Sequence, residues 1–226
     1  MITRSLTVDP HTPQLSALHE AISLLWKGRL VAFPTETFYG LGAHALDAEA
    51  VARVFSAKGR PPEKPLIVLV ESVAMAERLS RKIPPAAREL MARYWPGPLT
   101  LVLLAGDDLP PGVTAGTGTV SVRVPGHPLA LALVRAAGIP ITAPSANLSG
   151  VDPPTTAQEV LAGLGGRIDL ILDGGPTAGG LPSTIVDVTA EPPRVVRRGA
   201  VEVPGLAGCQ RPSQDSARRD GPARPR

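Results

Sequence analysis

Hydrophobic positions follow two different spacings along this chain. Near the N-terminus, apolar residues recur three or four positions apart, at Leu15, Leu18, Ile22 and Leu25. This spacing predicts an amphipathic helix, which we expect to end at Gly28. The continuous apolar run at residues 30–33 is too short for a helix and indicates a buried strand.

The two spacings alternate over the rest of the sequence. We expect helices at residues 71–80, 85–94 and 128–137, and another after a capping box formed by Thr156 and Glu159. Further strands are expected at residues 66–70, 99–104, 119–124, 139–142, 168–172, 184–188 and 195–196. Alternating helices and strands predict an α/β fold, and the closely spaced last strands predict a mixed sheet.

The segment from residue 33 to residue 70 holds the most distinctive chemistry. It opens with a hydroxyl-rich turn at residues 34–37, and Gly40 and Gly42 allow the backbone to approach a ligand closely. A helix capped by Asp47 is expected next. Three cations stand at its end and in the following loop, at Lys58, Arg60 and Lys64.

Other polar residues stand at loop starts or on a predicted core strand, at Ser121, Arg123, Ser145, Asn147, Thr155, Ser183, Thr184 and Arg197. Strand alternation places Arg123 either at a sheet edge or against a site. Each of these residues has an ordinary structural explanation, such as a turn or a solvated helix end. Together they suit a nucleotide, because cations neutralise phosphates while hydroxyls and amides bind ribose and base.

Charge and composition narrow the choice of function. Residues 204–226 carry five arginines and two aspartates, which accounts for the whole net charge of +3. The remaining chain is neutral and the seven aromatic residues are few, so the sequence does not favour nucleic-acid binding. We expect residues 204–226 to be a disordered Arg/Pro-rich tail.

Several classes of site are not predicted. The sequence has no P-loop, no GxGxxG and no GxSxG motif, its four histidines lack metal spacing, and Cys209 is the single cysteine. We therefore expect neither covalent catalysis nor a protein-held metal. No signal peptide and no apolar run of ~18 residues is present, so we expect a cytoplasmic protein.

Six motifs, in this order, carry a resemblance to a known family: PTETFYGLG, KGRPPEKPLIVLV, YWPGPLTLVL, SVRVPGHP, APSANLSG and STIVDVT followed by VVRRG. Across residues 10–200 the sequence resembles the YrdC/Sua5 family of threonylcarbamoyl-AMP synthases. The family's KxR and SxN pairs stand here at Lys58/Arg60 and Ser145/Asn147. The chain resembles the short form without the C-terminal Sua5 domain, and Leu69 stands where some relatives carry histidine.

The resemblance implies a single YrdC-like domain at residues 10–203, built on one twisted mixed sheet with flanking helices and a large concave cavity. It also implies a reaction in which L-threonine, bicarbonate or CO2 and ATP give L-threonylcarbamoyl-AMP and pyrophosphate. The product would serve downstream tRNA threonylcarbamoyltransferase proteins that make N6-threonylcarbamoyladenosine. Mg²⁺ would arrive with ATP, and direct tRNA binding would be weak.

Site roles follow from the resemblance together with residue chemistry. We expect Lys58 and Arg60 to be catalytic, and ATP to be bound by Lys58, Arg60, Lys64, Ser145, Asn147, Thr155 and Arg197. Threonine would contact Thr35, Ser121, Arg123 and Ser183. Alanine at Lys58 or Arg60 is expected to reduce pyrophosphate release with little change in melting temperature. Two alternatives remain open: an RNA-binding module without adenylation activity, and an enzyme that forms a carbamoyl adenylate.

Overall fold

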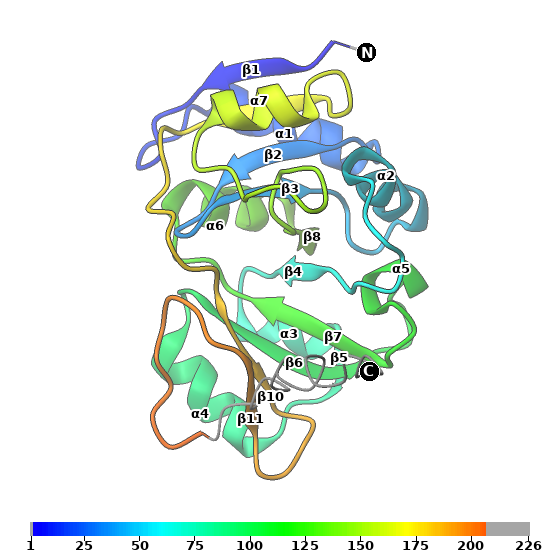
Figure 1. Ribbon diagram of the computed structural model, residues 1–226, viewed down its shortest axis with the longest axis vertical. Helices are drawn as coiled ribbons and strands as arrows, with labels where there is room; N and C mark the ends of the chain where they lie inside the picture. The colour runs from blue at the N-terminus through cyan, green and yellow to red at the C-terminus, as the bar shows by residue number, and fades with distance from the viewer. Residues whose placement is uncertain (1, 207–226) are drawn as a thin grey trace, which may run out of the picture.

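The computed structural model describes residues 2–206, which build two β-sheets with helices packed around them (Figure 1). The smaller sheet has the order β1 (Arg4–Thr7), β9 (Leu170–Asp173), β2 (Val31–Pro34) and β3 (Tyr39–Gly42). The larger sheet has the order β11 (Arg194–Arg197), β10 (Thr184–Asp187), β6 (Leu99–Ala105), β7 (Thr119–Arg123), β4 (Ile67–Leu69) and β8 (Ile141–Thr142). A further strand, β5 (Ser80–Lys82), pairs with β6. Both sheets mix parallel and antiparallel pairs, so the mixed α/β prediction is confirmed and the prediction of one sheet is wrong.

The helices are α1 (Leu15–Trp26), α2 (Ala48–Lys58), α3 (Val73–Arg78), α4 (Pro85–Tyr94), α5 (Pro111–Thr114), α6 (Pro128–Ala137) and α7 (Ala157–Leu164). Their capping signals form as predicted. The Asp47 side chain accepts hydrogen bonds from the first turn of α2, and Thr156 and Glu159 form the capping box of α7. Helices α1 and α6 pack on each other and on β2, while α7 packs on β9.

Three strands and one short helix, β1, β3, β5 and α5, fall where the sequence predicted none. Strand β3 has the sequence YGLG, and glycine is poor in strands, so its pattern favoured a loop. It forms because it pairs with β2 on one edge, and Gly40 forms an isolated bridge with Ser145 on the other. Tertiary pairing therefore overrides the local preference.

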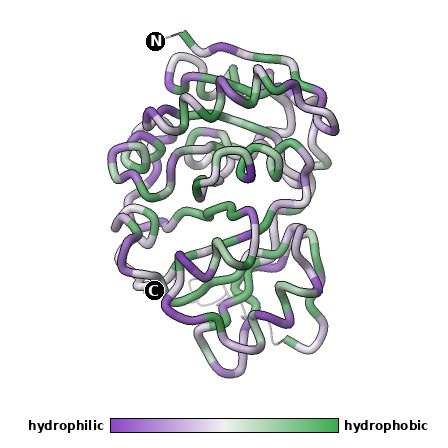
Figure 2. The backbone as a smooth tube through the Cα atoms, turned by 180° about the vertical axis from the view of Figure 1, so that it is seen from behind, coloured by the Kyte–Doolittle hydropathy of each residue, from purple (hydrophilic) through white to green (hydrophobic). Residues whose placement is uncertain are grey.

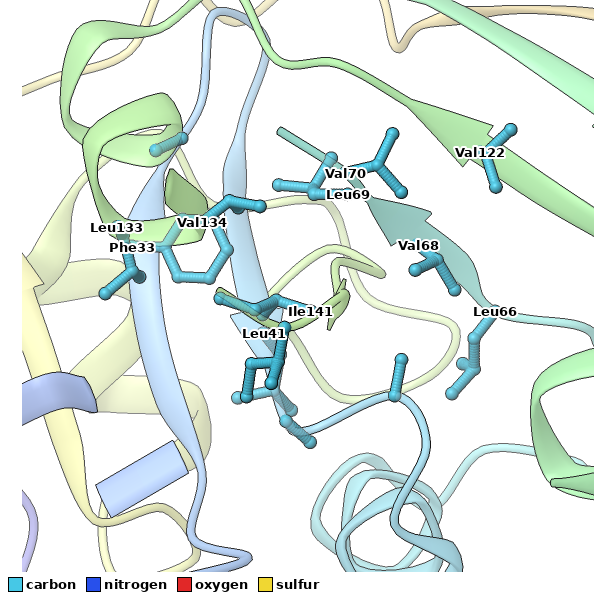
Figure 3. Close-up of a cluster of buried hydrophobic side chains, with 14 of the residues drawn as sticks. Phe33, Leu41, Leu66, Val68, Leu69, Val70, Val122, Leu133, Val134 and Ile141 are labelled. Carbon is cyan, nitrogen blue, oxygen red and sulfur yellow. The ribbon is translucent and has the colours of Figure 1, made fainter. Parts of the chain in front are cut away.

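Apolar side chains from both sheets meet at one seam, where Phe33, Leu41 and Ile141 lie near Val68 and Leu69 (Figure 3). Figure 2 shows most hydrophilic segments on the outer turns and helix faces. None of the helices within residues 2–206 has the length and apolar character that a membrane crossing requires. The predicted tail at residues 204–226 lies almost wholly outside the described residues, and the domain boundary stays a prediction.

The two-residue strand β8 joins the sheets. It pairs with β4 of the larger sheet, and Thr142 turns its side chain to the smaller sheet. The Thr142 hydroxyl donates to the Leu41 carbonyl at 3.0 Å and accepts from the Ala43 amide at 2.9 Å. Thr142 is fully buried, and its hydroxyl satisfies the Leu41 carbonyl and the Ala43 amide, two backbone groups in or next to β3 that need hydrogen-bond partners away from water.

Lys58, the last residue of α2, is only 2% exposed. Its ammonium donates to the Ser145 carbonyl, to the Asn147 carbonyl at 2.6 Å and to Asn147 Oδ1 at 3.2 Å. The Lys58 carbonyl accepts from the Ser149 amide at 2.8 Å. Lys58 thus joins the end of α2 to the loop that follows β8.

The same loop is bonded to β3 on its other side. The Leu41 amide donates to the Pro144 carbonyl and the Ala146 amide donates to the Tyr39 carbonyl, each at 2.8 Å. Residues 144–149 are therefore fixed between β3 and α2.

Burial, and secondarily the nearby Arg60 charge, lower the pKa of Lys58 to about 7. The three carbonyl oxygens oppose this shift, because each accepts a proton of the charged form.

We predict that Lys58→Met lowers the free energy of unfolding by about 3 kcal/mol, because three buried acceptors lose their donor. Since the pKa of Lys58 falls from 10.5 to about 7 on folding, the unfolded chain binds more protons between these values. Wild-type stability should therefore gain a contribution as pH rises from 7 that the variant lacks. Urea unfolding at several pH values measures both effects. Lys64→Met, at an exposed lysine, is the control and should change stability by under about 0.5 kcal/mol.

A second prediction concerns the seam. A Cβ at Gly42 would lie 2.7 Å from Phe33 Cε1 and 3.0 Å from Ile141 Cγ2, so Gly42→Ala should destabilise the fold by about 1–3 kcal/mol. Gly163 in α7 has open space around its position, and Gly163→Ala should instead stabilise by about 0.4–1 kcal/mol. Thermal unfolding of both variants measures the two changes in stability. Equal changes in the two variants would contradict the prediction.

Candidate active site

A cavity of about 450 Å³ opens between the two sheets. Its walls come from the turn between β2 and β3, the α2–β4 connection, strands β4 and β7, the loop after β8, and the segment from Pro182 to β11. Most predicted site residues line it, namely Thr35, Arg60, Lys64, Ser121, Arg123, Ser145, Ser183 and Arg197. Residues from several separate segments of the sequence therefore meet in one cavity.

Three predicted site residues do not line the cavity. Lys58 and Asn147 lie behind Ser145, where the lysine binds the loop's carbonyl oxygens. Thr155 lies at the start of α7, and its hydroxyl donates to Glu159 at 3.1 Å. We expected alanine at Lys58 or Arg60 to change the melting temperature little. The burial of Lys58 conflicts with this expectation for Lys58, so we retain the expectation for Arg60 alone.

Four positively charged side chains of the described residues line the cavity, namely Arg60, Lys64, Arg123 and Arg197. Arg60 donates to the carbonyl oxygens of Lys64 at 3.2 Å and Pro65 at 2.8 Å. The backbone of the α2–β4 connection therefore fixes the Arg60 side chain. Arg197 donates to the Ser183 carbonyl at 3.1 and 2.8 Å and to the Ser183 hydroxyl at 3.1 Å. Arg123 is 4% exposed and comes from a central strand, so it lines the site rather than a sheet edge.

Burial lowers the pKa of Arg60, Arg123 and Arg197, and the Arg123 charge lowers that of Arg197 further. Even so, guanidinium remains protonated at neutral pH. Positive charge is therefore concentrated in a partly desolvated space, where a polyanion would relieve the mutual repulsion. Among the described residues the walls include no His, Cys, Asp or Glu, so no neighbouring histidine or carboxylate in the walls can activate their hydroxyl groups as nucleophiles.

Hydroxyl groups supply the neutral part of the site. The Thr35 hydroxyl donates to the Phe38 carbonyl at 2.7 Å, and the Ser183 hydroxyl lies 2.9 Å from that of Thr100. Sequence reasoning missed the apolar walls, which include Phe38, Tyr39, Pro65, Ile67, Ala143, Pro153 and Ile185. Several of these residues belong to the quoted motifs, but their apolar character indicated core strands or turns.

Comparison with known proteins agrees with this architecture. Residues 23–199 match the family model that covers Sua5, YciO and YrdC proteins and is described as telomere recombination. A threonylcarbamoyl-AMP synthase of Bacillus subtilis is 49% identical over 195 residues, which are 86% of this chain and 56% of that protein. The chain thus spans little more than half the length of this relative.

Two solved structures share the fold. Pyrococcus abyssi Sua5 complexed with L-threonine superposes with a TM-score of 0.86 at 41% identity, over 92% of this chain and 62% of that one. Escherichia coli YciO superposes with a TM-score of 0.82 at 27% identity, over 90% and 98% of the two chains. The residues that the family model matches, 23–199, include all those that line the cavity, and the chain belongs to the Sua5, YciO and YrdC family.

Proposed function

We propose that this chain makes L-threonylcarbamoyl-AMP from L-threonine, bicarbonate or CO2 and ATP, and releases pyrophosphate. One observation carries the proposal: Arg60, Lys64, Arg123 and Arg197 converge with serine and threonine hydroxyls on one cavity. The likeness to the Bacillus subtilis synthase supports the reaction, and the threonine complex of Pyrococcus abyssi Sua5 supports the amino acid.

The chemistry needs no enzyme nucleophile. The threonine amine captures CO2 as a carbamate, a carbamate oxygen attacks the α-phosphorus of ATP, and pyrophosphate leaves. The enzyme has to hold the reactants in line and to neutralise charge along the triphosphate. A cavity walled by cations and hydroxyls meets both requirements.

We assign the triphosphate to the side of the cavity formed by Arg60 and Lys64. Ser145 would contact the nucleotide directly, and Asn147 would support it through the loop that Lys58 fixes. Arg197 would bind the nucleotide from β11, whereas Thr155 lies outside the cavity walls with its hydroxyl bonded to Glu159, so we no longer assign it to the nucleotide. Of the two residues predicted to be catalytic, Arg60 can reach the reacting phosphates, whereas Lys58 positions the loop.

Threonine is assigned to Thr35, Ser121, Arg123 and Ser183. Arg123 is suited to the carboxylate, because a guanidinium binds two oxygens at once. The hydroxyls of Thr35, Ser121 and Ser183 are suited to the side chain and the carbamate.

Magnesium enters as part of the ATP substrate. Within residues 2–206 no group of three or more His, Cys, Asp or Glu side chains could hold a metal ion. The donor set around the cavity is cationic, so the ion would be held by phosphate oxygens and water. The product would pass, in the cytoplasm, to downstream tRNA threonylcarbamoyltransferase proteins.

We predict pyrophosphate release from ATP and bicarbonate with L-threonine and not with other amino acids. Incubation with each amino acid in turn, followed by mass spectrometry of the adenylate, measures this. An adenylate formed from carbamoyl phosphate instead would identify a carbamoyl-adenylate enzyme, and binding of tRNA without turnover would identify an RNA-binding module.

Arg60→Ala should reduce kcat/KM for ATP by about 10–100-fold, because it removes a charged donor from the triphosphate. Stability should change by about 1 kcal/mol or less, since the Arg60 side chain is half-buried and, within residues 2–206, bonds to two backbone carbonyls. Pyrophosphate release and thermal unfolding measure the two effects. The control is Arg135→Ala, an exposed arginine in the last turn of α6, which should leave both unchanged. Equal losses of activity in the two variants would contradict the assignment.

A further inference from the structure

Arg123 is a buried cation whose hydrogen bonds the protein leaves open. It lies on β7, between β6 and β4, and is 4% exposed. Its guanidinium makes no hydrogen bond to any residue between 2 and 206, and its Nε is buried without a partner. A buried charged donor without acceptors is costly unless a ligand completes it.

One carboxylate balances this charge within the described chain. Glu36 Oε2 lies 3.8 Å from Arg123 Nη2, which is an ion pair but too long for a hydrogen bond. Glu36 Oε2 has no hydrogen-bond partner of its own among the described residues. Glu36 and Arg123 therefore attract each other electrostatically, while the N–H donors of Arg123 remain available to another acceptor.

The other oxygen of Glu36 fixes its place. Glu36 Oε1 accepts from the Gly126 amide at 3.1 Å. Glu36 belongs to the turn between β2 and β3 of the smaller sheet, whereas Gly126 follows β7 of the larger sheet. One side chain thus connects the two sheets beside the residue that lines the cavity.

Glu36 also counters a repulsion inside the site. Arg123 and Arg197 are close enough for the charge of one to lower the pKa of the other. Glu36 is not among the residues that line the cavity, whereas Arg123 is. Its carboxylate can hold Arg123 without repelling a substrate carboxylate directly.

We infer that Glu36 is a positioning residue, which orients the Arg123 guanidinium so that its open donors face the carboxylate of the amino-acid substrate. The inference rests on the proposed function, because it assumes that an amino acid is the ligand of Arg123. The sequence gives no hint of this role, since Glu36 lies in a turn where a solvated carboxylate is the ordinary case.

The test is Glu36→Gln, which keeps an oxygen for the Gly126 amide but removes the charge. We expect the KM for L-threonine to rise about tenfold, with kcat within about threefold and the KM for ATP unchanged, because only the orientation of Arg123 is lost. Glu36→Asp keeps the charge and should recover part of the threonine KM. Glu89→Gln, at an exposed glutamate of α4, is the matched control and should behave as wild type.

Direct binding of L-threonine by calorimetry, without ATP, separates the possible failures. If the wild type makes the adenylate and Glu36→Gln keeps its threonine affinity and KM, the role of Glu36 is overturned and the proposed function stands. A variant with equal losses in kcat and in both KM values would show a general structural role and would also overturn it. If the wild type neither binds nor uses threonine, both proposals fail together.

Discussion

The buried ammonium of Lys58 holds together the parts from which the cavity is made. It binds the backbone carbonyls of Ser145 and Asn147 in the loop after β8, and that loop is bonded in turn to the edge of β3. Three segments far apart in sequence are thereby fixed relative to one another. A cation is effective here because an ammonium offers three donors in three directions, and the loop presents three carbonyl oxygens to it.

The position of the cavity follows from the way in which the two sheets meet. Their apolar faces pack at the seam shown in Figure 3, and β8 contributes only two residues to the join. The cavity lies between the two sheets, and both polar and apolar side chains line it. A cleft between two sheets can carry several charges, because no single apolar face has to cover it.

The sequence predicts the elements better than their assembly. Helix caps at Asp47 and Thr156 act within a few residues, so local chemistry is enough to place them. Strand β3 and the division into two sheets depend on pairing between distant segments, which periodicity does not contain. The same limit applies to the site: Arg60 and Arg123 could be selected by charge and strand alternation, whereas the burial of Lys58 and the contact of Glu36 with Gly126 arise only after folding.

The positive side chains in and beside the cavity differ in how many of their hydrogen-bond donors the protein satisfies. Lys58 has all three donors filled by the loop and therefore acts on structure. Arg60 and Arg197 bond to nearby backbone carbonyls, which fixes their orientation and leaves part of each guanidinium free. Arg123 has one distant counter-charge and no hydrogen bond to the described residues. A buried cation without hydrogen-bond acceptors destabilises the free protein, and a ligand that supplies the acceptors removes this cost. The share of unsatisfied donors increases from Lys58 to Arg123. We therefore expect the energy gained on ligand binding to be largest at the strand that carries Arg123.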